Sequence, residues 1–116
     1  MSYRSDVALA IEGKTFQELI NSKDSDDIQA VLTWADDTIV NDNGNHLFVW
    51  NSISWDDWKN PINNFIQSLK MIEDQSSYLF LELGQSANEP NELGCWHDND
   101  FDLGFTRSLS FTIGNL

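Results

Sequence analysis

Positive charges, cysteines and long hydrophobic runs are all scarce in this sequence. Six Lys or Arg residues stand against nineteen Asp or Glu among 116 residues, which gives a formal net charge of −13. A field of that sign repels nucleic acid and anionic lipid, so direct binding to either is not expected. The single Cys95 excludes an intramolecular disulfide, and no stretch reaches the roughly 18 apolar residues that span a bilayer. The first residues lack the apolar segment of a secretory signal, so we expect a cytoplasmic protein.

Apolar residues are nevertheless sufficient for a folded core. Hydrophobic residues make up 41% of the chain and include five Trp, unlike the composition of an acidic disordered segment. Half of this chain would be too small to bury a core of its own. We therefore expect one domain over residues 1–116.

The spacing of apolar residues predicts an α+β domain. Runs with strand periodicity alternate with runs of helical spacing. Their order favours an antiparallel or mixed sheet of about five strands, with two or three helices packed on one face. The expected strands cover residues 7–11, 38–40, 46–50 with an extension as far as 55, 77–83 and 103–113.

Capping residues mark three helix starts. Thr15 begins a T-x-x-E capping box, Ser25 precedes a pair of Asp residues, and Asn60 stands before Pro61. Each start is followed by apolar residues at helical spacing. The residues expected on the buried faces are Phe16, Leu19, Ile20, Ile28, Val31, Leu32, Ala35, Ile62, Phe65, Ile66, Leu69 and Ile72.

Turn-forming residues separate these elements. The Asn- and Gly-rich stretch 41–45 predicts a hairpin turn, and residues 85–92 predict an exposed loop. Arg107 interrupts the apolar alternation of the last strand. It lies either near solvent at a strand end or beside an inward acid such as Glu82.

The residues needed for catalysis or for a metal site do not form a complete set. The only histidines are His46 and His97, and the pair Cys95 and His97 lacks the further ligands of a tetrahedral zinc site. We expect Cys95 to be a small buried thiol beside a histidine at the rim of the core. The sequence therefore predicts no enzyme activity, no metal and no cofactor.

An alternation of acids near the C-terminus imitates a calcium loop. Asp98, Asp100 and Asp102 have the spacing of its first ligands, but Leu103 and Leu109 stand where an EF-hand has Gly and Glu. A solvated acidic turn is the better interpretation.

Most acids lie in two segments that contain no Lys or Arg, residues 24–57 and 73–102, with eight acids in each. Their mutual repulsion costs stability, which suggests a use for the field, although plain solvation of the surface is the alternative. Such a field attracts basic protein surfaces, and a Trp among acids suits contact with Arg. The candidate partner-binding residues are Asp36, Asp37, Trp55, Asp56, Asp57, Trp58, Asp98, Asp100 and Asp102.

Three short motifs carry a family resemblance. They are the opening YRSDV at residues 3–7, the W-x-x-I-x-W pattern at residues 50–55 with the amphipathic helix after it, and the strand 78–84 that ends in Gly. Together they resemble a family of small acidic proteins encoded by phages and prophages, whose activity is unassigned. Gln85 stands where many members have Glu, so no role follows for a carboxylate there. The resemblance covers most of the chain and implies a phage origin.

The acidic field and the implied origin lead to one functional hypothesis. Small acidic accessory proteins of phages often resemble inhibitors of host defence, including anti-CRISPR and anti-restriction proteins. We expect an inhibitor in the host cytoplasm that binds a basic, nucleic-acid-binding surface of a defence protein. Its charges either mimic DNA geometry or simply attract basic protein. The alternatives are an immunity or regulatory protein that neutralises a single basic toxin, and a small enzyme or calcium-binding module.

Overall fold

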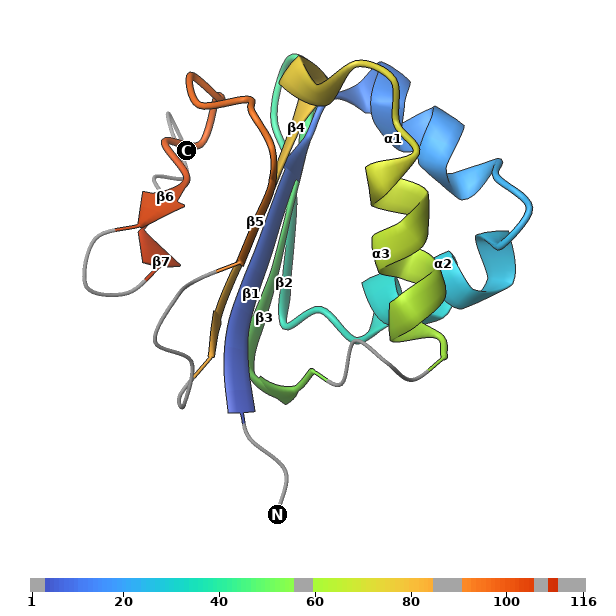
Figure 1. The fold of residues 1–116 in the computed structure, drawn as a ribbon. Coiled ribbons are helices and arrows are strands. Elements are labelled where there is room, and N and C mark those ends of the chain that lie inside the picture. Colours follow the sequence, from blue (N-terminus) through green and yellow to red (C-terminus); the bar gives the residue numbers. More distant parts are fainter. Residues whose placement is uncertain (1–3, 56–59, 85–90, 106–108, 111–116) are drawn as a thin grey trace.

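The fold is an antiparallel sheet with helices on one face and residues 95–105 on the other (Figure 1). A computed structural model describes residues 4–55, 60–84, 91–105 and 109–110 of the chain. The five strands follow the order β2-β3-β1-β4-β5, and each neighbouring pair is antiparallel. The predicted α+β class is confirmed. The elements are β1 (Arg4–Ile11), α1 (Gly13–Ile20), α2 (Ser25–Thr33), β2 (Asp37–Val40), β3 (His46–Ser54), α3 (Ile62–Lys70), the short 3-10 helix η1 (Gln75–Ser77), β4 (Tyr78–Gly84), β5 (Asn91–Gly94), β6 (Gly104–Phe105) and β7 (Leu109–Ser110).

Strand β1 is the centre of the sheet and is buried on both faces. It pairs with β3 on one side and with β4 on the other. Val7, Leu9 and Ile11 contact the helix-side core, whereas Ala8 and Ala10 contact the opposite core. Alternate residues of a strand point to opposite faces, so this one segment supplies both layers.

The helix-side core contains large aromatic side chains that are also hydrogen-bonded. Trp50, Phe65 and Tyr78 are fully buried, and the rings of Trp50 and Phe65 meet edge to face with centroids 6.1 Å apart. The indole N–H of Trp50 donates to the carbonyl of Val31 at 2.9 Å, and the hydroxyl of Tyr78 donates to that of Leu69 at 2.8 Å. These two bonds fasten α2 and α3 to the sheet.

The opposite core lies under residues 96–103, which we call the Asn99 turn. Trp96, Phe101 and Leu103 of this turn pack on the small side chains of β1 and on the strands beside it. The Asn99 amide nitrogen donates to the carbonyls of Trp96 and Leu103 at 3.0 and 3.2 Å. Its oxygen accepts from the N–H groups of Phe101 and Leu103 at 3.1 and 2.9 Å. A side chain that is 3% exposed thus has partners for all its polar atoms.

Strand β2 forms one edge of the sheet. Within the described part of the chain it pairs with β3 alone, from Asp37 opposite Val49 to Val40 opposite His46. Val40 is 56% exposed, and Asp37 is exposed as well. The other side of β2 therefore presents backbone groups that another strand could pair with.

The strand predictions before residue 85 are confirmed. The hairpin turn contains Gly44 with a φ of 79°, and β3 continues past the core to Ser54. Strand β4 is an inner strand of the sheet, as its apolar run predicted. The loop predicted over 85–92 is too long, because β5 begins at Asn91. Residues 85–90 lie outside the described part of the chain.

The capping box predicted for the first helix is wrong. Helix α1 begins at Gly13, so Thr15 lies inside the helix and is buried. The side-chain oxygen of Asn45, in the β2–β3 hairpin loop, accepts from the N–H of Gly13 at 3.1 Å. A partner distant in the sequence therefore satisfies one of the helix's free amides, which a local motif was expected to satisfy.

The other two capping predictions are also wrong. The buried stripe of α3 is confirmed, whereas in α2 Ile28 and Val31 are buried and Leu32 and Ala35 are only partly buried. Asp24 precedes α2 and Pro61 precedes α3, and neither side chain forms a capping hydrogen bond. Ser25 is the first residue of α2, and Asn60 lies one residue before the position that caps α3.

In the described ranges, no helix is long and apolar enough to cross a membrane.

The single strand predicted over 103–113 is wrong. The chain forms two short strands there, with Gly104 opposite Ser110 and Phe105 opposite Leu109. A period of two can continue through a hairpin, so periodicity alone does not show where the chain reverses. Arg107 and residues 111–113 lie outside the described part of the chain. The two alternatives for the position of Arg107 therefore stay predictions.

Candidate acidic interaction surface

The predicted partner-binding acids lie in two separate places. Asp36 and Asp37 are exposed where the chain enters the edge strand β2. Asp98, Asp100 and Asp102 are exposed in the Asn99 turn, on the face of the sheet opposite the helices (Figure 1). The described acids of the two cation-free segments are therefore distributed over both layers. The remaining candidates Asp56, Asp57 and Trp58 lie outside the described residues.

A β-bulge shapes the first of these places. The register of β1 against β3 shifts between Ser5 and Val7, so that Asn51 and Ser52 together stand opposite Asp6. Ser52 has a φ of 51°, in the left-handed region that residues other than Gly rarely adopt. The bulge bends the strand and takes the backbone amides of Asn51 and Ser52 out of the regular register with β1.

Two carboxylates bind these amides. The N–H of Asn51 donates to Asp36 Oδ2 at 2.6 Å, and the N–H of Ser52 donates to Asp6 Oδ1 at 2.8 Å. The guanidinium of Arg4 donates to the carbonyl of Ser52 at 3.0 Å. Hydrogen bonds with an ionised acceptor are among the stronger ones, so Asp6 and Asp36 are held in fixed positions at this end of the sheet.

Asp100 connects the Asn99 turn to the β2–β3 hairpin loop. Its Oδ2 accepts from the side-chain amides of Asn45, Asn41 and Asn43 at 2.7, 2.8 and 3.4 Å. These hydrogen bonds, that of Asn45 first, lower the pKa of Asp100 because they favour the ionised carboxyl. Asn45 also accepts from Gly13, so one loop links the two layers of the fold. The turn predicted as merely solvated thus contains a carboxylate with structural contacts.

Sequence reasoning missed these supporting residues. The hairpin loop places Asn at positions 41, 43 and 45, more amides than a turn needs, and this alternation was a usable signal. Asn41 Oδ1 also accepts from the N–H groups of Asn43 and Asn45, both at 3.0 Å, which shapes the loop itself. For Asp6 the sequence has no comparable signal, because its contact depends on the bulge.

The structure corrects the prediction for Trp55 and explains the W-x-x-I-x-W pattern. Trp55 is 6% exposed and packs against Trp50 and Phe80 with centroids 5.6 and 5.9 Å apart. It is not available as an exposed anchor, and Trp50 beside it is fully buried. The extra residue in the bulge reverses the alternation of β3, so Ile53 and Trp55 return to the core face that Trp50 occupies.

The expected buried thiol is also wrong. Cys95 and His97 are exposed, and Trp96 between them takes the inward position. His46 instead stacks on Phe16, with ring centroids 4.2 Å apart, and burial lowers its pKa. No group of three or more His, Cys, Asp or Glu side chains among the described residues is placed to hold a metal ion.

Hydrogen bonds position the carboxylates without cancelling their charge. Asp27 accepts from the amide of Asn64 at 2.6 Å, and Glu82 accepts from Asn91 and from Ser5 at 3.0 and 3.1 Å. The carboxylates at the bulge and in the Asn99 turn likewise accept from backbone or side-chain amides. Neutral donors leave each negative charge intact. The surface therefore combines a strong field with acids in fixed positions.

Comparison with known proteins identifies no relative. The chain matches no family model, and neither the curated proteins nor the solved structures contain a significant match. The resemblance to a phage family stays a prediction, and the functional argument depends on the surface described above.

Proposed function

We propose that the protein is a phage-derived inhibitor that binds a basic, nucleic-acid-binding surface of a host defence protein. The observation that supports it most is that several carboxylates of a chain with a formal net charge of −13 are held in place by neutral backbone or side-chain amides. Such a field speeds encounter with a positively charged groove. Side chains already ordered lose less conformational freedom when a partner binds.

The proposed contact centres on the bulge end of the sheet. Asp36 and Asp6 are each held by a backbone N–H through one oxygen, and among the described residues no hydrogen bond to the other oxygen is seen. Asp37 beside them is exposed and has no other role assigned. An Arg guanidinium matches a carboxylate with two parallel hydrogen bonds, so an Arg-rich groove is the preferred partner surface.

Recovery of the partner is the first test. The tagged protein is purified from infected cells and from host lysate, and the proteins bound to it are identified. The proposal predicts a nucleic-acid-binding protein whose association rate constant falls steeply between about 0.05 and 0.5 M salt, because salt screens charges. Recovery of a single basic toxin would favour the immunity alternative. Recovery of no nucleic-acid-binding protein, or a rate constant indifferent to salt, would contradict the proposal.

Matched variants then locate the contact. Asp36→Asn with Asp37→Asn removes two charges at the bulge end, while Asp26→Asn with Glu92→Gln removes two elsewhere on the surface. Asn at position 36 keeps a side-chain oxygen for the N–H of Asn51. We expect the first pair to weaken binding about tenfold more than the second, which corresponds to about 1.4 kcal/mol. Equal losses would mean that net charge alone matters and that this end of the sheet is not the contact.

A further inference from the structure

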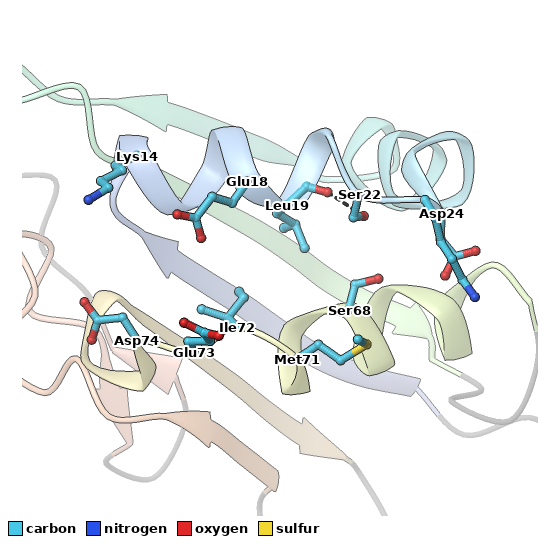
Figure 2. Close-up of a pocket in the computed structure, with 11 residues that line it drawn as sticks. Lys14, Glu18, Leu19, Ser22, Asp24, Ser68, Met71, Ile72, Glu73 and Asp74 are labelled. Carbon is cyan, nitrogen blue, oxygen red and sulfur yellow. Dashed lines mark hydrogen bonds between the residues drawn. The ribbon is translucent and has the colours of Figure 1, made fainter.

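A groove of about 790 Å³ lies between α1 and the C-terminal end of α3 (Figure 2). Helix α2 packs against both of these helices, which leaves the groove open between them. Its size falls within the range of about 300 to 1,000 Å³ typical of ligand sites. The groove lies on the helix layer and uses neither the bulge carboxylates nor the Asn99 turn.

The groove has an apolar interior. Figure 2 shows Leu19 of α1 and Ile72, two residues after α3, pointing toward one another across it. Both side chains are almost fully buried, whereas Met71 beside them is 82% exposed. An exposed, flexible thioether next to a buried apolar floor can close over an incoming apolar group. This part of the groove suits one aliphatic or aromatic side chain.

The walls of the groove are negatively charged. Four carboxylates and two ammonium groups line it, with Glu18 on the α1 wall and Glu73 and Asp74 on the opposite wall. The C-termini of α1 and α3, at Ile20 and Lys70, both lie beside it. A helix C-terminus carries partial negative charge and favours cations. The carboxylates outnumber the ammonium groups of Lys14 and Lys23, so the rim around the apolar interior has a net negative charge.

We propose that this groove receives an apolar side chain from a basic segment of the partner protein, with flanking Arg or Lys residues bound by the carboxylates of its walls. This inference rests on the proposed function, which supplies a basic protein as partner. A second copy of the chain is a poor occupant, because it has the same charge of −13 and only six Lys or Arg. The groove would contribute specificity through shape, while the overall field speeds encounter.

A pair of defined peptides tests the proposal. The probes are acetyl-Arg-Arg-Leu-Arg-Arg-amide and its counterpart with Gly in place of Leu, each titrated into the full chain labelled for backbone-amide NMR. We expect the Leu peptide to shift the amides of Leu19, Ser22 and Ile72, and to bind about tenfold more tightly than the Gly peptide, as for a largely buried Leu side chain.

A positive charge introduced at either of two exposed positions gives the matched control. Met71→Lys adds a positive charge at the groove, and Gln67→Lys adds the same charge on an exposed position of α3 outside the lining. We expect the first to weaken binding of the Leu peptide at least fivefold and the second less than twofold. Both positions are exposed, so both variants are expected to fold, which thermal unfolding verifies.

The outcomes separate this inference from the proposed function. Peptide-induced shifts near Asp36 and Asp37 without shifts in the groove would refute the groove as the binding site. The proposed function would not be affected by that result. Equal affinity of the two peptides would remove the apolar anchor from the proposal. The absence of binding by either peptide would contradict both, since a surface of this charge should retain an arginine peptide at low salt.

Discussion

Replacement of Asn99 by Ala should destabilise the protein more than any surface change of similar size. The Asn99 amide makes four hydrogen bonds within its turn and is 3% exposed. A hydrogen bond contributes about 0.5 to 1.5 kcal/mol net, and a buried group left without a partner costs about 1 to 3 kcal/mol. Water can reach some of the freed groups, so we expect a loss of about 3 kcal/mol, a large part of the roughly 5 to 15 kcal/mol typical of a domain.

The Asp variant at the same position separates hydrogen bonding from packing. Asn99→Asp keeps the shape and both bonds accepted from Phe101 and Leu103. It replaces the two donated bonds with a carboxylate oxygen facing the carbonyls of Trp96 and Leu103. We expect it to be at least as destabilising as Ala at pH 7. It should recover partly at low pH, where a protonated carboxyl can donate one bond again.

Urea unfolding followed by tryptophan fluorescence measures both effects, because Trp96 packs in the layer that this turn forms. Asp98→Ala is the control, since Asp98 is an exposed neighbour in the same turn and should cost less than about 0.5 kcal/mol. An unfolding free energy of Asn99→Ala within about 0.5 kcal/mol of the parent would refute the role assigned to the amide. If Asn99→Ala loses the full expected unfolding free energy and Asn99→Asp loses none at pH 7, the role assigned to the two donated bonds is refuted.

Four further predictions concern charge and backbone conformation. The pKa of Asp100 is lowered in the folded protein, so its contribution to stability is present above the unfolded pKa and lost as pH falls through the folded value. Asp100→Asn should therefore flatten the acid side of a plot of unfolding free energy against pH. Gly94→Ala should cost more than about 2 kcal/mol in urea unfolding, because the φ is 78° and the new Cβ would collide with the Tyr78 carbonyl oxygen. Ser52→Gly should stabilise by about 0.5 kcal/mol and Ser52→Val should destabilise, since the φ of 51° suits Gly. Raising salt from about 0.05 to 0.5 M should raise the Tm, because it screens repulsion among nineteen acids, and a fall would contradict the electrostatic argument.

The elements that the sequence predicts well are those whose burial follows a local period. In β1 the alternation of Val7, Leu9 and Ile11 with two Ala residues is visible in the chain, and both faces prove to be buried. The apolar stripe of α3 is equally local, and Phe65 and Leu69 are fully buried as expected. Such patterns depend only on neighbours within one element, so no tertiary information is needed.

The candidate site could not be predicted in the same way, because it depends on contacts between distant residues. At least one of Trp55 and Trp58 was expected at the surface among acids, but one extra residue in the β3 bulge turns Trp55 inward. The cap of α1 comes from Asn45, thirty-two positions later in the chain. Asp100 was recognised as acidic, but its amide partners could be found only once the hairpin and the Asn99 turn were placed together.

The exposed edge of β2 gives the net charge a second consequence, for the behaviour of concentrated solutions. At neutral pH two copies of the protein repel each other, and Asp37 at the start of the strand adds to that barrier. As pH falls toward about 4, where Asp and Glu take up protons, the repulsion disappears. The edge with its exposed Val40 then becomes a template for strand pairing between molecules. The negative charge that we propose for partner binding therefore also prevents fibrous association at neutral pH. Mild acid would remove this protection.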